Sequence, residues 1–321
     1  MCSNTGLQTK NQSFFTYASG KKYLALAYAL ARSYRYHNGS SIPFAIISNS
    51  DFDLPWDLNW VKKLIFDEEI VGKGLEFKLK LLAIAPSYES IFIDADSLIY
   101  GKINHLFESF DRQTPNVIGL KVTDGVFVEE NVQKACVEFE LAYMIRYCGA
   151  LYYLIKNGNG KNVFDYAAKL NQSNRPFQRN ENTIYDEPIL SIAMSKFKVN
   201  PLPDDGNIWG DLVHLDYETQ LNIFKSRPIF NNDVNANNYK FWLPIGEYSP
   251  NILHVGSGNY NKKPWLFDAL RLKLHYKFFL PVPLSNWLVK LIIIPIYQLA
   301  RKLLRNSEET NKNKIPKWII F

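Results

Sequence analysis

Short apolar runs alternate with an amphipathic stretch over the first part of the chain. Residues 13–18 (SFFTYA), 43–47 (PFAII) and 61–66 (VKKLIF) have the composition of strands. Between the first two, residues 21–36 repeat apolar side chains at a helical period, at Leu24, Ala27, Tyr28 and Ala31. This strand, helix, strand order is typical of a nucleotide-binding α/β sheet.

The same pattern predicts the elements that follow. In chain order they are a helix over 74–85 stopped by Pro86, a buried strand ending at Asp94, a short helix over 103–107, strands over 117–122 and 150–155, a helix over 162–170, a polar loop over 171–182 and a helix over 187–197. Residues 123–147 show no clear period, and we expect a long excursion over the site there.

Two carboxylates interrupt the chain directly after the apolar run Ile91-Phe92-Ile93. Asp94 and Asp96 therefore stand at the carboxyl end of a buried strand, where open α/β sheets bind ligands. Because neighbouring carboxylates repel each other, keeping both ionised favours a hard divalent cation, which can in turn bind a diphosphate. The pattern predicts a metal and diphosphate site.

The chain contains a second pair of aspartates one residue apart, Asp51 and Asp53. Two aspartates at this spacing are common in proteins, so the spacing alone does not identify a metal site. This pair follows Ser48-Asn49-Ser50 and runs into Leu54-Pro55, which is typical of a turn. We expect that copy to be a solvated loop.

Composition bounds the class of protein. The 321 residues are 47% hydrophobic, enough for a substantial core, and the three cysteines (Cys2, Cys136 and Cys148) form no paired framework. Residues 1–10 carry no basic region leading into an apolar core, so no signal peptide is expected. The opening loop at Ser19-Gly20 matches neither a dinucleotide nor a P-loop fingerprint. We expect a globular cytoplasmic protein.

The net charge of +6 is unevenly distributed. Residues 266–321 hold ten basic and three acidic side chains, a net +7, which leaves −1 on the first 265 residues. A nucleic-acid groove along the core is therefore not expected.

The segments that carry a family resemblance are Phe77-Lys78-Leu79, Asp94-Ala95-Asp96-Ser97-Leu98 with the short helix after it, Asp186-Glu187, and His254-Val255-Gly256 through Lys263-Pro264-Trp265. In this order they resemble glycosyltransferase family 8, the glycogenin-like retaining transferases, which also include bacterial enzymes that add sugars to lipopolysaccharide. The resemblance covers about residues 13 to 265. It implies a GT-A fold, a nucleotide-diphospho-sugar transferase fold with one mixed central sheet flanked by helices, over residues 1–265.

The resemblance also implies a site and a reaction. Asp94, Asp96 and His254 would hold Mn²⁺ or Mg²⁺, and Lys78 with Lys262 or Lys263 would neutralise the diphosphate of a UDP-sugar donor. Asp186 and Glu187 would face the donor sugar and a glycan or lipid-linked acceptor as catalytic residues. The remaining donor-binding positions are Tyr17, Ala18, Ser19, Tyr23, Ala95 and Gly256.

Departures from the family pattern lie mainly on the sugar side of the site. Tyr147-Cys148-Gly149 stands where the family commonly has Asn-Ser-Gly or Asn-Ala-Gly, and Glu187 replaces a glutamine. The interval from His254 to Lys263 is three residues longer than the family form. The resemblance therefore leaves the donor sugar open.

Three site residues have structural alternatives. His254 beside an apolar strand could be a core histidine, Lys78 next to Lys80 could lie on an exposed helix face, and Asp186 could serve only as a helix N-cap. The histidines His37, His105, His214 and His275 are interpreted as structural or surface residues.

Residues 266–321 form a basic C-terminal tail in which apolar side chains crowd around Pro295. With Pro295 as an interruption, the uninterrupted apolar piece is too short to span a membrane. Basic and aromatic residues in such a segment indicate an interfacial anchor on an anionic membrane surface, with a helix packed on the core as the alternative.

Two other functions remain open from the sequence. A haloacid-dehalogenase-type phosphatase also follows a strand with two aspartates, and Asp204-Asp205-Gly206 could supply its later acidic motif, although that nucleophile strand normally opens the fold. The substituted sugar-side residues allow a non-catalytic sugar-nucleotide-binding relative.

Overall fold

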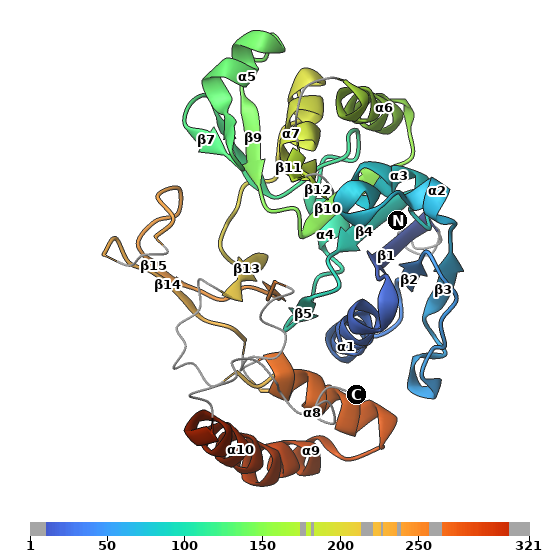
Figure 1. The fold of residues 1–321 in the computed structure, drawn as a ribbon, viewed down its shortest axis with the longest axis vertical. Coiled ribbons are helices and arrows are strands. Elements are labelled where there is room, and N and C mark those ends of the chain that lie inside the picture. The colour runs from blue at the N-terminus through green and yellow to red at the C-terminus, as the bar shows by residue number, and fades with distance from the viewer. Residues whose placement is uncertain are drawn as a thin grey trace, which may run out of the picture.

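A five-stranded mixed sheet forms the centre of the molecule. The computed structural model describes residues 11–173, 178–180, 183–212, 221–225, 227–235, 239–256 and 265–307. The strand order is β10-β4-β1-β2-β3, in which β1 (Gln12–Tyr17), β2 (Phe44–Ser48), β3 (Lys62–Ile65) and β4 (Glu89–Ile93) are parallel and β10 (Leu151–Ile155) is antiparallel (Figure 1). The predicted mixed α/β fold with a central sheet flanked by helices is confirmed.

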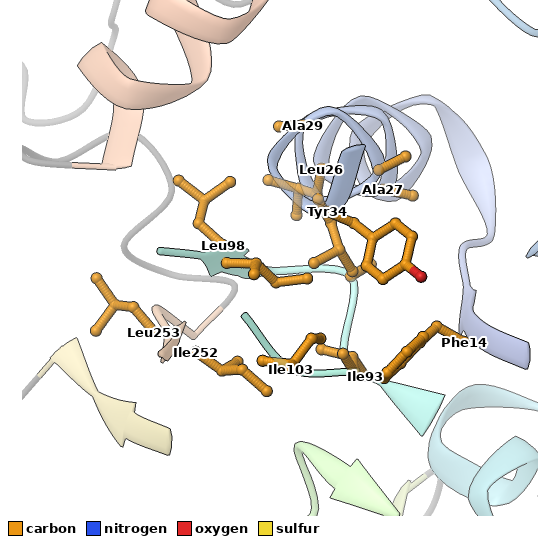
Figure 2. Packing of buried hydrophobic residues seen from close by; sticks show 14 of the residues in the cluster. Phe14, Leu26, Ala27, Ala29, Tyr34, Ile93, Leu98, Ile103, Ile252 and Leu253 are labelled. Atoms are coloured by element: carbon orange, nitrogen blue, oxygen red, sulfur yellow. The ribbon is translucent and has the colours of Figure 1, made fainter. Parts of the chain in front are cut away.

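Both faces of this sheet are covered, which explains the continuous apolar runs of its strands. Successive residues point to opposite faces, so Phe14 packs into one core cluster and Phe15 into the other. On the first face lies α1 (Gly20–Asn38), which buries Leu26, Leu30 and Tyr34, as Figure 2 shows for part of this cluster.

The second face is covered by helices from two parts of the chain. These are α2 (Glu68–Val71), the 3-10 helix η3 (Gly74–Lys80), α3 (Leu81–Ile84), α6 (Gly158–Gln172) and α7 (Asp186–Lys196). The predicted helix over 74–85 is therefore wrong in type for its first half. The predicted polar loop over 171–182 contains the end of α6 and a strand, β11 (Gln178–Asn180), which pairs with β12 (Thr183–Ile184).

The excursion between residues 123 and 147 consists of very short elements beside the sheet. They are β7 (Val126–Phe127), β8 (Glu130–Asn131), α5 (Val132–Glu138) and β9 (Met144–Tyr147). Strand β9 pairs antiparallel with β6 (Gly119–Val122), which precedes the excursion and lies within the predicted strand 117–122. Two-residue strands are too short to carry a detectable period, which is why the sequence predicted an excursion here and no individual elements.

A second, smaller sheet stands beyond the carboxyl end of β4. Its order is β13-β16-β5, with β13 (Trp209–Asp211), β16 (Ile252–His254) and β5 (Ser97–Ile99). The short helix α4 (Leu106–Ser109) follows β5, while the hairpin of β14 (Phe230–Asn232) and β15 (Gly246–Tyr248) and the 3-10 turn η2 (Trp56–Leu58) complete the regular structure of the described residues before the tail. This small sheet brings late segments of the chain to the acidic pair.

The tail is helical and packs partly on α1. Helix α8 (Trp265–Lys277) contacts α1, and it is followed by α9 (Val282–Leu288), the π-helical turn η5 (Val289–Ile293) and α10 (Ile294–Ser307) at the bottom of Figure 1. Pro295 does not interrupt this helix, because the widened π turn lies directly before it, where the missing proline N–H would disturb the α-helical bonds.

The expectation of a segment too short to span a membrane is therefore wrong on length. Val282–Ala300 is long and apolar enough to cross a membrane, and 17% of its most apolar window is buried against the protein. Core helices of soluble proteins meet the same criterion of length and composition. The helix is therefore long enough to span a membrane, but its length does not show that it lies in one.

Asp268 fixes α8 to the body of the protein. Its buried carboxylate accepts hydrogen bonds from Tyr100 Oη (2.7 Å), from the Ile223 amide (3.1 Å) and from Arg271 Nη1 (2.5 Å). Tyr100 follows β5 directly, so this contact joins the tail to the small sheet.

We expect Asp268→Ala to destabilise the protein by about 3–5 kcal/mol, because it leaves the buried Arg271 guanidinium without its carboxylate. Urea unfolding followed by circular dichroism measures the change. Asp165→Ala, which removes an exposed carboxylate on α6, is the control and should change stability by about 0.5 kcal/mol or less. Equal unfolding midpoints for the two variants would contradict the anchoring role.

Candidate functional site

The acidic pair lies in the turn that joins β4 to β5. The Asp94 amide donates to Ala150 O (2.9 Å), the Ser97 amide to Asp94 O (3.1 Å) and the Val255 amide to Asp96 O (3.1 Å). These backbone bonds tie the turn to β10 on one side and to the end of β16 on the other. The two carboxylates are therefore held in a fixed arrangement at the carboxyl end of the sheet.

His254 reaches the pair through strand pairing. It sits opposite Ser97 in the antiparallel β16-β5 ladder, and its Nε2 lies 3.4 Å from Asp96 Oδ1. The ligand atoms of Asp94, Asp96 and His254 all lie within 4.8 Å of one another. Two carboxylates and one imidazole form a donor set that fits Mn²⁺ or a similar divalent cation.

Asp211 is a site residue that sequence reasoning missed. It lies beside His254 in the parallel β13-β16 ladder, and its Oδ2 is 3.1 Å from His254 Nδ1. A carboxylate on the second ring nitrogen fixes the orientation of a metal-binding imidazole. Nothing local in the sequence signals this pairing, because the two residues are 43 positions apart.

His254 and its two carboxylate neighbours, Asp96 and Asp211, affect one another's ionisation. Burial disfavours the imidazolium, but hydrogen bonds to Asp211 and Asp96 outweigh it and raise the pKa of His254 well above its usual range. Burial likewise opposes ionisation of Asp96, yet the bond with His254 lowers the pKa of Asp96. Without a metal, protonated His254 thus supplies positive charge that a bound cation would replace.

Lys78 supplies the other positive charge. Its Nζ donates to Asp94 Oδ2 (3.0 Å) and to Gly149 O (2.7 Å), and lies 4.0 Å from Asp186 Oδ2. Burial opposes the charge, but the carboxylates of Asp94 and Asp186 outweigh it and raise the pKa of Lys78. The alternative of an exposed helix face is wrong, since Lys78 is 7% exposed.

Asp186 and Glu187 open α7 on the opposite side of Lys78. Tyr185 holds the N-cap position, so Asp186 is not simply a cap; its carboxylate is buried, 3.5 Å from the Tyr152 hydroxyl that donates to it. Glu187 Oε1 accepts a 2.6 Å bond from the Gly149 amide. Burial raises the pKa of both carboxyl groups.

The predicted nucleotide-side residues lie where β1 leads into α1. The Ala18 amide donates to Ile47 O (2.8 Å) and Ser19 Oγ to Asn49 Oδ1 (2.8 Å), while the ring of Tyr17 stacks on Phe77 with centroids 4.4 Å apart. Tyr23 is 38% exposed. Since β1 and β4 are parallel neighbours, this segment shares the sheet edge with the acidic pair.

The remaining predicted residues divide into placed and undescribed ones. Ala95 is buried between the two aspartates, and Gly256 follows β16 with a φ of 72°, a conformation that favours glycine. Lys262 and Lys263 lie outside the described residues.

Asp204 and Asp205 take no part in this site. Asp204 Oδ2 pairs with the buried Lys240 Nζ (3.2 Å) and accepts from Trp242 Nε1 (3.2 Å), while Asp205 Oδ1 accepts from the Asn207 amide (2.8 Å). These contacts give both residues structural roles. The later acidic motif of a phosphatase is therefore not assembled by this segment.

Comparison with known proteins supports the fold. No protein-family model matches the chain, and no curated protein matches it. Among solved structures, the apo bifunctional glycosyltransferase WbbM aligns with a TM-score of 0.51 at 10% identity, over 88% of this chain and 53% of WbbM. The galactosyltransferase LgtC in complex with donor and acceptor sugar analogues aligns with a TM-score of 0.44 at 10% identity, over 74% of this chain and 86% of LgtC.

A third structure, the apo glycosyltransferase GlyE of Streptococcus pneumoniae TIGR4, aligns with a TM-score of 0.39 at 14% identity, over 60% of this chain and 46% of GlyE. At these identities the similarity shows the fold alone. The conclusion on the fold rests on WbbM, whose TM-score is 0.51. The chain has the predicted GT-A-like glycosyltransferase fold and spans about half the length of WbbM. None of these likenesses assigns it to family 8 in particular.

We expect Asp211→Asn to weaken Mn²⁺ binding at the Asp94, Asp96 and His254 site by about 10- to 100-fold, because the carboxylate that orients the imidazole is lost. Electron paramagnetic resonance of free Mn²⁺ during titration measures the affinity. Asp124→Asn, at an exposed position, is the matched control. Unchanged affinity in Asp211→Asn would contradict the orienting role.

Proposed function

We propose that this chain is a metal-dependent retaining glycosyltransferase that moves a sugar from a UDP-sugar to a glycan or lipid-linked acceptor. The observation that carries the proposal is the convergence of Asp94, Asp96 and His254 within 4.8 Å at the carboxyl end of β4. A fold shared with a known glycosyltransferase supports it. The hexosyl and family 8 character rests on the sequence resemblance.

In this proposal each half of the site has its own task. Asp94, Asp96 and His254 hold Mn²⁺ or Mg²⁺, which when bound supplies charge neutralisation for a departing diphosphate. Tyr17, Ala18, Ser19 and Tyr23 receive the uridine. Lys78 balances the carboxylates on both sides of it, and Lys262 or Lys263 reaches the phosphates, with Ala95 and Gly256 lining the donor site.

Asp186 and Glu187 orient the donor sugar and the acceptor. The acceptor hydroxyl attacks the sugar carbon on the face from which the diphosphate departs: the bond to the phosphate oxygen breaks, a bond to the acceptor oxygen forms, and the acceptor proton passes to the departing phosphate. Holding the reactants in this arrangement is the main contribution of the Asp186 and Glu187 carboxyl groups. Configuration at the sugar carbon is thereby retained.

The phosphatase and the non-catalytic sugar-nucleotide-binding protein, the two alternative functions, predict different assay results. A phosphatase would release phosphate without a sugar nucleotide, but the structural role of Asp204 and Asp205 disfavours it. A non-catalytic relative would bind UDP-sugar without transfer or hydrolysis.

We also propose that residues 266–321 form a tail that holds a cytoplasmic enzyme on an anionic membrane surface, close to a lipid-linked acceptor. The helix from α9 to α10 exposes large apolar side chains at Trp287, Leu291, Ile296 and Leu299. Val289 and Tyr297 pack into the core cluster, so one side of the helix is anchored and the other is free for lipid. The net +7 of the tail would attract anionic headgroups.

We expect UDP or a UDP-sugar at about 100 times its Kd to raise the melting temperature by about 5 °C with Mn²⁺ present and much less without it. Asp96→Asn should abolish the Mn²⁺-dependent part, because one ligand of the cation is lost. Thermal-shift assays across nucleotides and nucleotide sugars measure this, and they identify the donor.

The second acidic pair provides the matched control. Asp53→Asn changes an exposed aspartate in the same two-aspartate pattern and should leave the shift unchanged. Equal Mn²⁺-dependent shifts in the Asp96→Asn and wild-type chains would sink the metal assignment. A shift with Mg²⁺ and a phosphate mimic but with no nucleotide would favour the phosphatase.

For the tail, we expect the triple change Trp287→Ala, Leu291→Ala and Ile296→Ala to reduce cosedimentation with vesicles containing anionic lipid, because exposed apolar area drives interfacial binding. The double change Val137→Ala and Ile245→Ala, at apolar positions exposed elsewhere, is the control. Added salt should weaken binding of the wild-type chain. Alkaline carbonate should extract a surface-attached protein from cell membranes. Failure to extract this protein would contradict a surface attachment.

A further inference from the structure

The two ring nitrogens of His254 lie next to carboxylates from two different parts of the chain. Nε2 points toward Asp96, whereas Nδ1 points toward Asp211. The ligand atoms of Cys148, Asp211 and His254 all lie within 4.8 Å of one another, as do those of Asp94, Asp96 and His254. The proposed transfer reaction uses only the second of these trios.

Cys148 is held in place by its neighbour. It lies in the turn between β9 and β10 with a free, half-buried thiol, and its Sγ lies within 4.8 Å of a ring nitrogen of His254. The backbone of Gly149 is fixed on both sides, its carbonyl by Lys78 (2.7 Å) and its amide by Glu187 (2.6 Å). The thiol is thus part of a built arrangement and not an isolated surface cysteine.

The two trios differ in the cations they prefer. Asp94 and Asp96 contribute oxygens, which suit Mn²⁺ and Mg²⁺. Cys148 adds a soft sulfur to a nitrogen and an oxygen, a donor set typical of Zn²⁺ and, by the same softness, of Cd²⁺. On such ligands Zn²⁺ also binds more strongly than Mn²⁺.

We propose that Cys148, Asp211 and Nδ1 of His254 form a second metal site, specific for thiophilic divalent cations such as Zn²⁺. On binding, the thiol loses its proton to solvent and the thiolate becomes a ligand. The remaining coordination positions are taken by water.

Occupation of the second site excludes the first one. A neutral imidazole has a lone pair on only one nitrogen, so coordination through Nδ1 leaves Nε2 carrying the proton. His254 can then donate to Asp96 but cannot bind a cation held by Asp94 and Asp96. Zn²⁺ therefore removes one of three ligands from the proposed transferase metal, a consequence that rests on the proposed function, whereas the second site itself does not.

The test of the site compares two full-length chains that each keep a single cysteine. Cys2→Ser with Cys136→Ser leaves Cys148, and Cys2→Ser with Cys148→Ser leaves the half-buried Cys136 as the matched control. Titration with Cd²⁺, followed by the ultraviolet thiolate-to-cadmium absorption, should show one Cd²⁺ per Cys148-only chain, bound at least about tenfold more tightly than by the Cys136-only chain. Equal affinities would overturn the proposal.

The partner ligand is tested in the Cys148-only chain. Asp211→Asn should weaken Cd²⁺ binding by at least about tenfold, and Asp124→Asn should not. Circular dichroism confirms folding of each variant. If Asp211→Asn left the Cd²⁺ affinity unchanged, Cd²⁺ would be bound by the Cys148 thiol without Asp211, and the proposed site would be overturned.

Mutual exclusion is tested by competition on the wild-type chain. Substoichiometric Zn²⁺ should suppress Mn²⁺ binding measured by electron paramagnetic resonance, and Cys148→Ser should remove much of that suppression. Tight Cd²⁺ binding together with unchanged Mn²⁺ binding would overturn the exclusion. Tight Cd²⁺ binding in a chain that never binds Mn²⁺ or UDP would instead defeat the proposed function and leave the second site standing.

Discussion

Charge balance among buried carboxyl groups is the constraint on which the site depends. Asp94, Asp96 and Asp186 gather at one end of the sheet with Glu187 and Asp211 close by, and burial alone would push them toward the neutral form. Lys78 and His254 supply the positive charge among the described contacts of this group. Each cation touches carboxylates from different elements, so the same contacts that balance charge also join β4, η3, α7, β13 and β16.

This balance explains why a divalent cation would be accepted without rebuilding the site. His254 bonds to two carboxylates as an imidazolium, and a cation held by Asp94 and Asp96 would replace that proton with a larger charge at nearly the same place. Lys78 remains on the other side of Asp94 and offsets part of the negative charge of Asp94 and Asp186. Under the proposed function, one arrangement of side chains would thus serve both a protonated form and a metal-bound form of the site.

How much of this was predictable depends on how local each signal is. The apolar run before Asp94 and the helical period from residue 21 are local, so β4, β1 and α1 were predicted to within a few residues. Asp211 and Cys148 reach His254 only through the β13-β16 ladder and the β9-β10 turn, which no period in the sequence encodes. The grouping of Lys78 with Asp186 likewise required the packing of η3 against α7.

In the tail, a local signal led to a wrong prediction. The rule that proline interrupts a helix made the predicted apolar helix too short. Proline disturbs α-helical hydrogen bonds, but the π turn at Val289–Ile293 moves the bonding pattern just before Pro295 and lets the helix continue to Ser307. The continuous helix keeps Val289 and Tyr297 buried while other large apolar residues face outward.

Gly149 connects the Lys78 side of the site to the Glu187 side. Its carbonyl accepts from Lys78 and its amide donates to Glu187, so one peptide segment spans the two groups of carboxylates. A Cβ at this position would lie 3.1 Å from Glu187 Oε1 and 3.0 Å from Tyr152 Oη, closer than neighbouring atoms normally allow. A larger residue at this position would require Glu187 or Tyr152 to shift by a few tenths of an ångström. Cys148 directly precedes Gly149 in the same turn. Cys148 and Glu187 are thus linked through the peptide unit of Gly149, whose amide donates to Glu187 Oε1.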